Sequence, residues 1–80
     1  MTTDSLLDLL ADIAGTNEVR KNAQLALYDT QVLDSMRTVD LILALDERYG
    51  INISPAEFDR EAWATPEKFV ADVQSRKSAA

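Results

Sequence analysis

The segment Val32–Val39 holds the residues of this chain whose types and spacing could do chemistry. Within it, Asp34 and Ser35 lie side by side at the point where a loop passes into a strongly apolar helix. A serine at a helix start can cap the helix, or it can carry a covalently attached phosphate ester, which the unpaired N–H groups and the helix dipole stabilise. Position alone favours the cap, so the remaining sequence must decide between the two interpretations.

The chain supplies this serine with no catalytic partner. It contains no histidine and no cysteine, which excludes Ser-His and Cys-His catalysis, a histidine-based metal site and any disulfide bond. The adjacent acids Asp46 and Glu47 point to different sides of a helix and cannot act together as a general acid and base. Asp29, Asp34 and Asp40 lack the spacing of a calcium loop, and the chain has too few glycines for a phosphate-binding loop. We therefore expect neither an enzyme nor a metal site.

The composition is that of a folded protein rather than a disordered chain. The 80 residues are 46% hydrophobic and 28% charged, which predicts one small domain spanning residues 1–80. No apolar run approaches the roughly 20 residues needed to cross a bilayer. The N-terminus also lacks the basic start of a secretory signal. We therefore expect a cytoplasmic protein.

The charge of the chain is strongly acidic, because fourteen acidic residues against eight basic ones give a net charge of −6. The phosphates of a nucleic acid would be repelled by such a surface, so nucleic-acid binding is not expected. Partners with basic patches would be attracted by electrostatic steering. The alternative is that the acidity only maintains solubility.

Hydrophobic periodicity predicts three principal helices and no strand, and therefore a small all-α bundle of three to four helices. The helices are expected at Asp4–Ala14, at Ser35–Tyr49, and from Pro66 into a C-terminal segment that frays from Ser75 to Ala80. The expected caps are Asp4 or Ser5 for the first helix and Thr65 for the third.

The connections between these helices are expected to be irregular. They are a long loop over Thr16–Asp34 with one helical turn near Glu18–Asn22, an extended segment at Ile51–Ile53, and a single helical turn at Pro55–Phe58. The long loop carries five apolar residues that can anchor it: Leu25, Leu27, Tyr28, Val32 and Leu33. A loop of this length in a compact domain is often functional.

The central helix has more apolar residues than one core-facing stripe requires. A period of 3.6 residues places five residues inward: Thr38, Leu41, Ile42, Leu45 and Tyr49. Met36, Val39 and Leu43 then fall on a neighbouring face, and we call these three residues the docking strip. Three acids lie beside them and are called the steering acids: Asp40, Asp46 and Glu47. An exposed apolar strip rimmed by acids indicates a docking surface, although the three apolar residues could instead widen the core.

The sequence around the serine resembles that of a known family. Asp34–Met36 followed by Thr38–Leu41 is similar to the Asp-Ser-Leu/Met attachment motif of acyl and peptidyl carrier proteins. This resemblance implies a small acyl-carrier-protein-like helical bundle with a long loop between the first two principal helices. It also implies that Ser35 bears 4'-phosphopantetheine, whose thiol the chain itself lacks, and that the helix after it recognises partners.

The C-terminal half resembles one group within that family. Glu57–Lys68 is similar to the Glu-Phe-x-Arg-x-x-Trp-x-Thr-x-x-Lys signature of D-alanyl carrier proteins. Arg37 departs from the pattern, because these carriers usually have a small residue there, and it puts a positive charge beside the attachment serine. We expect Trp63 to be a packing anchor. We expect Arg60 to pair with neighbouring acids (Asp59, Glu57 or Glu61) or with loop carbonyls.

The resemblance implies a non-catalytic carrier with several partners. A phosphopantetheinyl transferase would modify Ser35, which Asp34 helps to present, using coenzyme A and Mg²⁺. A D-alanine–carrier protein ligase would load D-alanine as a thioester with ATP. The carrier, expected to be a monomer, would then dock with a membrane-bound O-acyltransferase at the inner face of the cell membrane, for D-alanylation of lipoteichoic acid. The docking strip and the steering acids would guide these encounters.

Two alternatives remain open from the sequence. One is a stand-alone aminoacyl or acyl carrier of another biosynthetic pathway, with the same chemistry and a different cargo. The other is a helical interaction module without an attached arm, in which Ser35 only caps its helix.

Overall fold

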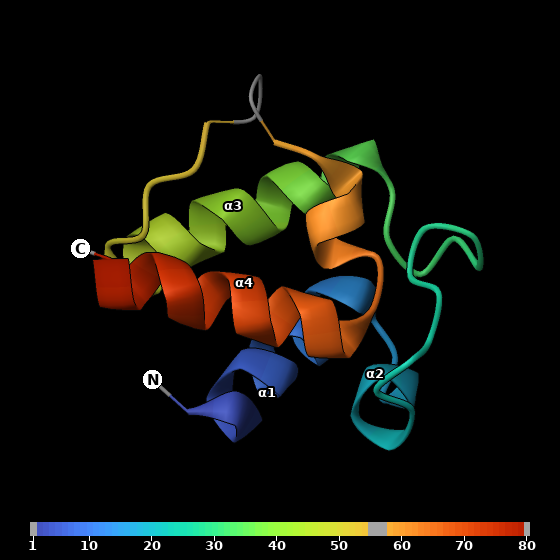
Figure 1. Cartoon of the computed structure of the whole chain (residues 1–80). Helices are drawn as coiled ribbons and strands as arrows, with labels where there is room; N and C mark the ends of the chain where they lie inside the picture. The colour runs from blue at the N-terminus through green and yellow to red at the C-terminus, as the bar shows by residue number, and fades with distance from the viewer. Residues whose placement is uncertain (1, 55–57, 80) are drawn as a thin grey trace.

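The computed structural model describes residues 2–54 and 58–79, and every regular element in these ranges is helical. The elements in chain order are α1 (Thr3–Ala14), α2 (Glu18–Lys21), α3 (Ser35–Tyr49), the 3₁₀ helix η1 (Arg60–Trp63) and α4 (Pro66–Ala79). Helix α1 contacts each of the other three α-helices, and η1 contacts α4 (Figure 1). The prediction of a small all-α bundle is confirmed.

Helix α1 starts one residue earlier than the sequence indicated, and its cap is a different residue. Thr2 caps the helix, because its side chain accepts a hydrogen bond from the Ser5 N–H at 3.1 Å. The Ser5 hydroxyl in turn accepts from the Thr2 N–H at 3.0 Å, which completes a capping box. The prediction that Asp4 or Ser5 caps this helix is therefore wrong. Ser5 instead serves as the second half of the box.

Helix α3 has the bounds that the sequence predicted, and local signals at both ends explain why. Asp34 is extended and caps the start, with its carboxylate accepting from the Arg37 N–H at 2.8 Å. Gly50 ends the helix with a φ of 67°, a left-handed conformation that favours glycine. Its N–H donates back to the carbonyls of the last turn.

The C-terminal part differs from the prediction in two ways. Helix α4 begins at Pro66 as expected, with the Thr65 hydroxyl accepting from the Lys68 N–H at 3.2 Å, but it continues to Ala79 instead of fraying from Ser75. The second difference is η1, which the sequence did not predict. Of the turn expected at Pro55–Phe58, residues 55–57 lie outside the described ranges, and Phe58 is not helical.

One core cluster joins the helices. Its members with no accessible surface come from four elements and the long loop: Leu6, Leu10, Leu27, Leu41, Leu45, Trp63, Phe69 and Val73. Trp63 is the packing anchor that the sequence indicated, since its ring centroid lies 4.5 Å from that of Phe58 and 4.9 Å from that of Phe69. Its indole N–H donates to the Asp72 carboxylate at 2.8 Å, so the buried polar atom is satisfied.

The inward face of α3 largely agrees with the prediction. Four of the five expected residues are buried: Thr38, Leu41, Ile42 and Leu45. Tyr49, the fifth, is half-buried. The periodicity therefore identified the core-facing side of the helix.

The long segment between α1 and α3 is ordered by two kinds of contact. It contains α2, close to the turn predicted there, and it buries Leu27 and Leu33 in the core. Backbone hydrogen bonds join it to the chain near η1 and α4, from the Leu27 N–H to the Ala64 carbonyl at 2.9 Å and from the Glu67 N–H to the Ala23 carbonyl at 3.1 Å. The loop thereby brings Tyr28 and Ser35 to the same side of the molecule as η1.

Among the helices of residues 2–54 and 58–79, none has the combination of length and apolar character that a membrane crossing requires.

Candidate functional site

Ser35 is the first residue of α3, and its side chain is exposed. The helix cap is Asp34, not Ser35, because the Asp34 carboxylate takes the hydrogen bond from the backbone of the first turn. The interpretation of Ser35 as the cap is therefore wrong. Its hydroxyl lies on the surface at a helix N-terminus, where the helix dipole favours an anion by about 0.3–1 kcal/mol.

Arg60 contacts this hydroxyl from the other half of the chain. Its Nη2 donates to the Ser35 Oγ at 2.7 Å, across 25 positions of sequence. The same guanidinium lies 5.2 Å from the centroid of the Tyr28 ring, which is a cation–π arrangement. The sequence predicted instead that Arg60 pairs with acids close to it or with loop carbonyls. Of those acids, Glu57 lies outside the described ranges.

Tyr28 connects the Arg60 contact to the start of α3. The Tyr28 and Thr38 hydroxyl oxygens lie 2.7 Å apart, and the Thr38 hydroxyl donates to the Asp34 carbonyl at 2.7 Å. Because the one Thr38 proton is used in that bond, the Tyr28 hydroxyl is the donor to Thr38. Burial raises the pKa of the Tyr28 phenol, an effect that Thr38 and Arg60 partly oppose and Asp34 reinforces. Tyr28 is therefore a neutral donor at physiological pH.

Arg37, the residue that departs from the D-alanyl carrier pattern, is directed away from Ser35 along the preceding loop. Its Nη1 donates to the Val32 carbonyl at 3.1 Å, and the side chain is half-buried. The positive charge therefore stabilises the loop end before α3. This contact explains how an arginine fits beside the serine.

The docking strip is exposed, with 78% of Met36, 42% of Val39 and 57% of Leu43 accessible to solvent. The alternative that these residues widen the core is therefore wrong. The steering acids are also exposed: Asp40, Asp46 and Glu47. At 3.6 residues per turn, the strip and the acids together occupy roughly a third of the helix circumference, next to the azimuth of Ser35.

A small pocket lies beside the serine. It has a volume of about 190 Å³ and is lined by Ser35, Thr38, Val39, Ile42, Phe58 and Arg60. Ligand pockets that bury a small molecule usually have about 300–1,000 Å³. This pocket by itself is therefore too small to enclose a cofactor.

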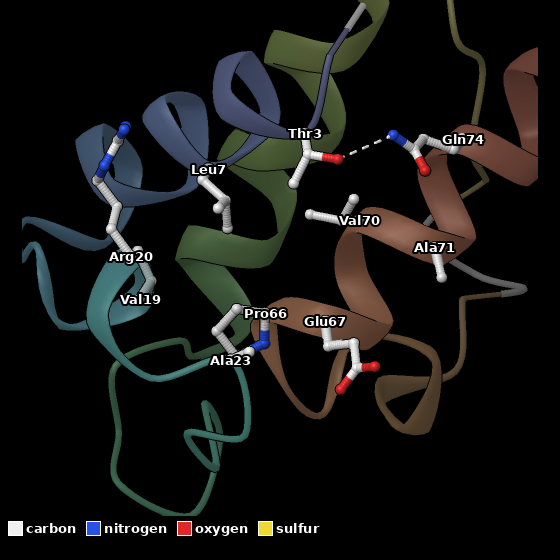
Figure 2. A pocket seen from close by; sticks show the side chains of 10 residues that line it. All are labelled: Thr3, Leu7, Val19, Arg20, Ala23, Pro66, Glu67, Val70, Ala71 and Gln74. Atoms are coloured by element: carbon white, nitrogen blue, oxygen red, sulfur yellow. Dashed lines mark hydrogen bonds between the residues drawn. The ribbon is translucent and has the colours of Figure 1, made fainter.

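A larger pocket lies elsewhere, between α1, α2 and α4 (Figure 2). It has a volume of about 480 Å³ and shares no lining residue with the Ser35 pocket. Both of its charged side chains already have partners, because Arg20 forms an ion pair with Asp8 and Glu67 accepts from the Gln24 amide. It contributes nothing to the chemistry at Ser35.

The polar groups around Ser35 fit a covalently attached phosphodiester better than a metal. The nearest side-chain donor to its oxygen is a cationic guanidinium, which attracts phosphate and repels a metal ion. Within residues 2–54 and 58–79, no three histidine, cysteine or acidic side chains gather where they could hold a metal ion. A guanidinium beside an exposed hydroxyl can stabilise an anionic group attached to that oxygen.

Comparison with known proteins agrees with this chemistry. The sequence matches the family described as phosphopantetheine attachment site over residues 4–73, from α1 into α4. The chain therefore belongs to this family of carrier proteins, which are not enzymes themselves and bear covalently attached 4'-phosphopantetheine.

Within that family, the chain is similar to D-alanyl carrier proteins. It is 45% identical to the one from Lacticaseibacillus rhamnosus over 71 residues, which cover 89% of this chain and 88% of the relative. It is 41% identical to the one from Staphylococcus saprophyticus over 68 residues, which cover 85% of this chain and 87% of the relative. Against the one from Listeria monocytogenes (strain HCC23), the identity is 39% over 74 residues, covering 92% and 95%. The predicted resemblance to D-alanyl carriers is confirmed.

Two residues beside Ser35, Tyr28 and Arg60, make contacts that the sequence does not indicate. The sequence predicts Tyr28 as an apolar anchor of the loop, and no pattern in it indicates a role for the hydroxyl. Arg60 belongs to the Glu57–Lys68 signature, and this position in the motif is the one sign in the sequence that it has a functional role. No local pattern indicated that it contacts Ser35.

Proposed function

We propose that this protein carries D-alanine on a 4'-phosphopantetheine arm attached to Ser35 and delivers it for D-alanylation of lipoteichoic acid. The arm supplies the thiol that the chain lacks, and D-alanine is carried on it as a thioester. The names of the relatives support the cargo. The carrier motif around Ser35 supports the attachment point.

One observation carries the proposal, namely that the Ser35 hydroxyl is exposed and is not used as the cap of α3. Because Asp34 performs the capping, Ser35 can be modified without loss of the bond that starts the helix. In this proposal Asp34 has two roles. It fixes the first turn that presents Ser35, and it offers a negative charge to the phosphopantetheinyl transferase.

The docking strip is proposed to contact each partner in turn: the transferase, the D-alanine–carrier protein ligase and the membrane-bound O-acyltransferase. Met36 is the most exposed of the three residues and lies next to the attachment serine. Its flexible thioether side chain suits several partner surfaces. The steering acids add a negative rim that attracts partners with basic patches and raises the rate of encounter. The protein acts as a monomer in the cytoplasm and docks at the inner face of the membrane.

The test of attachment is an intact mass measurement. The wild type and Ser35→Ala are each incubated with a promiscuous phosphopantetheinyl transferase, coenzyme A and Mg²⁺. A mass gain on the wild type alone supports attachment at Ser35. No gain on the wild type, with a transferase that modifies a known carrier in parallel, would contradict the proposal.

The test of the cargo uses the modified protein. Purified D-alanine ligase, ATP and a mixture of competing amino acids are added, and the mass of the loaded carrier is measured. Selective gain of D-alanine supports the proposed pathway. Loading of another amino acid from the mixture as well as or better than D-alanine would instead favour a stand-alone carrier of a different pathway.

A further inference from the structure

Arg60 forms a hydrogen bond to the Ser35 hydroxyl oxygen, the atom through which the arm would be attached. Its Nη2 donates to the Ser35 Oγ at 2.7 Å. A guanidinium is a donor only, so this bond does not depend on the serine proton. When the hydroxyl is converted to a phosphate ester, the same oxygen becomes the ester oxygen, and a phosphodiester with a negative charge replaces the proton. The guanidinium would then face an anion instead of a neutral hydroxyl.

The guanidinium of Arg60 is held in place by an aromatic ring. It lies 5.2 Å from the centroid of the Tyr28 ring. Tyr28 is itself fixed by its hydrogen bond to Thr38 in the first turn of α3. An arginine stacked in this way loses less side-chain freedom when it binds an anion than a free one does. The fork is therefore oriented before the arm is attached.

The charge of Arg60 is also available for an anion. Within residues 2–54 and 58–79, no carboxylate forms an ion pair with it, and the two ion pairs found there involve Arg20 and Arg76. Arg37, which is close to Ser35 in the sequence, donates to the Val32 carbonyl instead. Arg60 is therefore the cation placed to bind a phosphodiester on the Ser35 oxygen.

We propose that Arg60 binds the phosphodiester of the attached arm and fixes the direction in which the arm leaves the protein. The planar fork would donate to the phosphate oxygens, where a charge-assisted bond is about twice as strong as a neutral one. The arm would thereby be anchored on both sides, by α3 through the covalent bond and by η1 through Arg60. This inference rests on the proposed attachment of the arm to Ser35.

The experiment measures the ³¹P resonance of the phosphodiester in the modified protein. The wild type, Arg60→Gln, Arg60→Lys and Arg48→Gln are modified with the promiscuous transferase, and intact mass confirms the arm on each. Arg48→Gln removes the same charge from the last turn of α3 and is the matched control. We expect Arg60→Gln to move the ³¹P resonance and Arg48→Gln to leave it in place. Arg60→Lys should give a shift between those of the wild type and Arg60→Gln, because it keeps the charge and loses the fork.

A salt titration of the modified wild type and of modified Arg60→Gln gives a second measurement. At about 1 M salt the Debye length is about 3 Å, so an exposed ion pair is weakened. We expect the ³¹P resonance to move toward its position in Arg60→Gln as salt increases, and the resonance of Arg60→Gln itself to move less. An unchanged resonance in both measurements, or equal shifts in Arg60→Gln and Arg48→Gln, would overturn the role of Arg60. Failure of the wild type to gain mass would instead contradict the attachment to Ser35.

Discussion

The Tyr28 hydroxyl donates to the Thr38 hydroxyl across 2.7 Å, and this bond joins the long loop to the first turn of α3. The Thr38 hydroxyl in turn donates to the Asp34 carbonyl at the start of the same helix. The ring of Tyr28 meanwhile supports the guanidinium that contacts Ser35. The loop, α3 and η1 are therefore connected around the serine by one short series of contacts.

Removing the Tyr28 hydroxyl should lower the stability of the protein without removing the ring beneath Arg60. We expect Tyr28→Phe to reduce the free energy of unfolding by about 1 kcal/mol, the usual value of one hydrogen bond between side chains. Urea unfolding of the wild type, Tyr28→Phe, Thr38→Val and the double variant would measure this and the coupling between the two residues. Additive losses in the double variant would show that the two hydroxyls do not stabilise the fold together.

The ionisation of Tyr28 should make stability depend on pH in the alkaline range. Burial raises the pKa of its phenol above the ordinary value of 10.0, so the folded state holds this proton more tightly than the unfolded state does. The resulting stabilisation is complete below about pH 10 and is lost as the pH rises through the folded-state pKa. In urea unfolding, we expect the difference in stability between the wild type and Tyr28→Phe to stay constant from about pH 8 to about pH 9, and to narrow as the pH rises above about 10 through the raised pKa of Tyr28. A constant difference over this range would contradict the raised pKa.

Substitutions at Asp34 should separate its role as a cap from the effect of its charge. Asp34→Ala removes the acceptor for the Arg37 N–H and should cost about 0.5–2 kcal/mol of stability, whereas Asp34→Asn keeps a capping side chain and should cost much less. Thermal unfolding of the unmodified proteins measures this difference. If the negative charge also matters to the transferase, Asp34→Asn should be modified more slowly than the wild type although it is nearly as stable. Equal modification rates would leave Asp34 with the capping role alone.

Charge reversal on the steering acids should affect the rate of loading but not the fold. We expect the double variant Asp40→Lys, Glu47→Lys to be loaded by the D-alanine ligase roughly tenfold more slowly at low salt, with a flatter dependence on salt concentration. Both residues are exposed, so each substitution should change the free energy of unfolding by no more than about 0.5 kcal/mol. The double variant Asp4→Lys, Asp12→Lys, which reverses two exposed acids on α1, is the matched control. An unchanged loading rate in the double variant, or equal slowing in the control, would contradict the proposal that the steering acids attract the ligase.

The sequence by itself determined the features that depend on residues close together in the chain. The bounds of α3 follow from Asp34 at its start and Gly50 at its end, both of which act within one helical turn. The exposure of Met36 and Leu43 follows from the 3.6-residue period of the same helix. The position of Ser35 at the helix start, and its resemblance to an attachment motif, were visible for the same reason.

Local signals were less reliable where several residues could perform the same task. Thr2, Asp4 and Ser5 all have side chains of a type that can cap a helix. The capping box that selects Thr2 depends on backbone geometry that composition does not specify. The continuation of α4 past Ser75 has a similar explanation. The side chain of Arg76 bonds to Asp72 one turn earlier at 2.8 Å, and this pair supports a helix that the polar sequence alone did not indicate.

Only the tertiary structure decided what surrounds Ser35. The Arg60 contact joins residues 25 positions apart, and the Tyr28 ring reaches Arg60 because the long loop is bonded to the chain near Ala64. Such contacts depend on how the helices pack, and the residue types on either side of them carry no pattern that specifies the pairing. The sequence therefore identified the serine, whereas the fold placed the guanidinium that defines its surroundings.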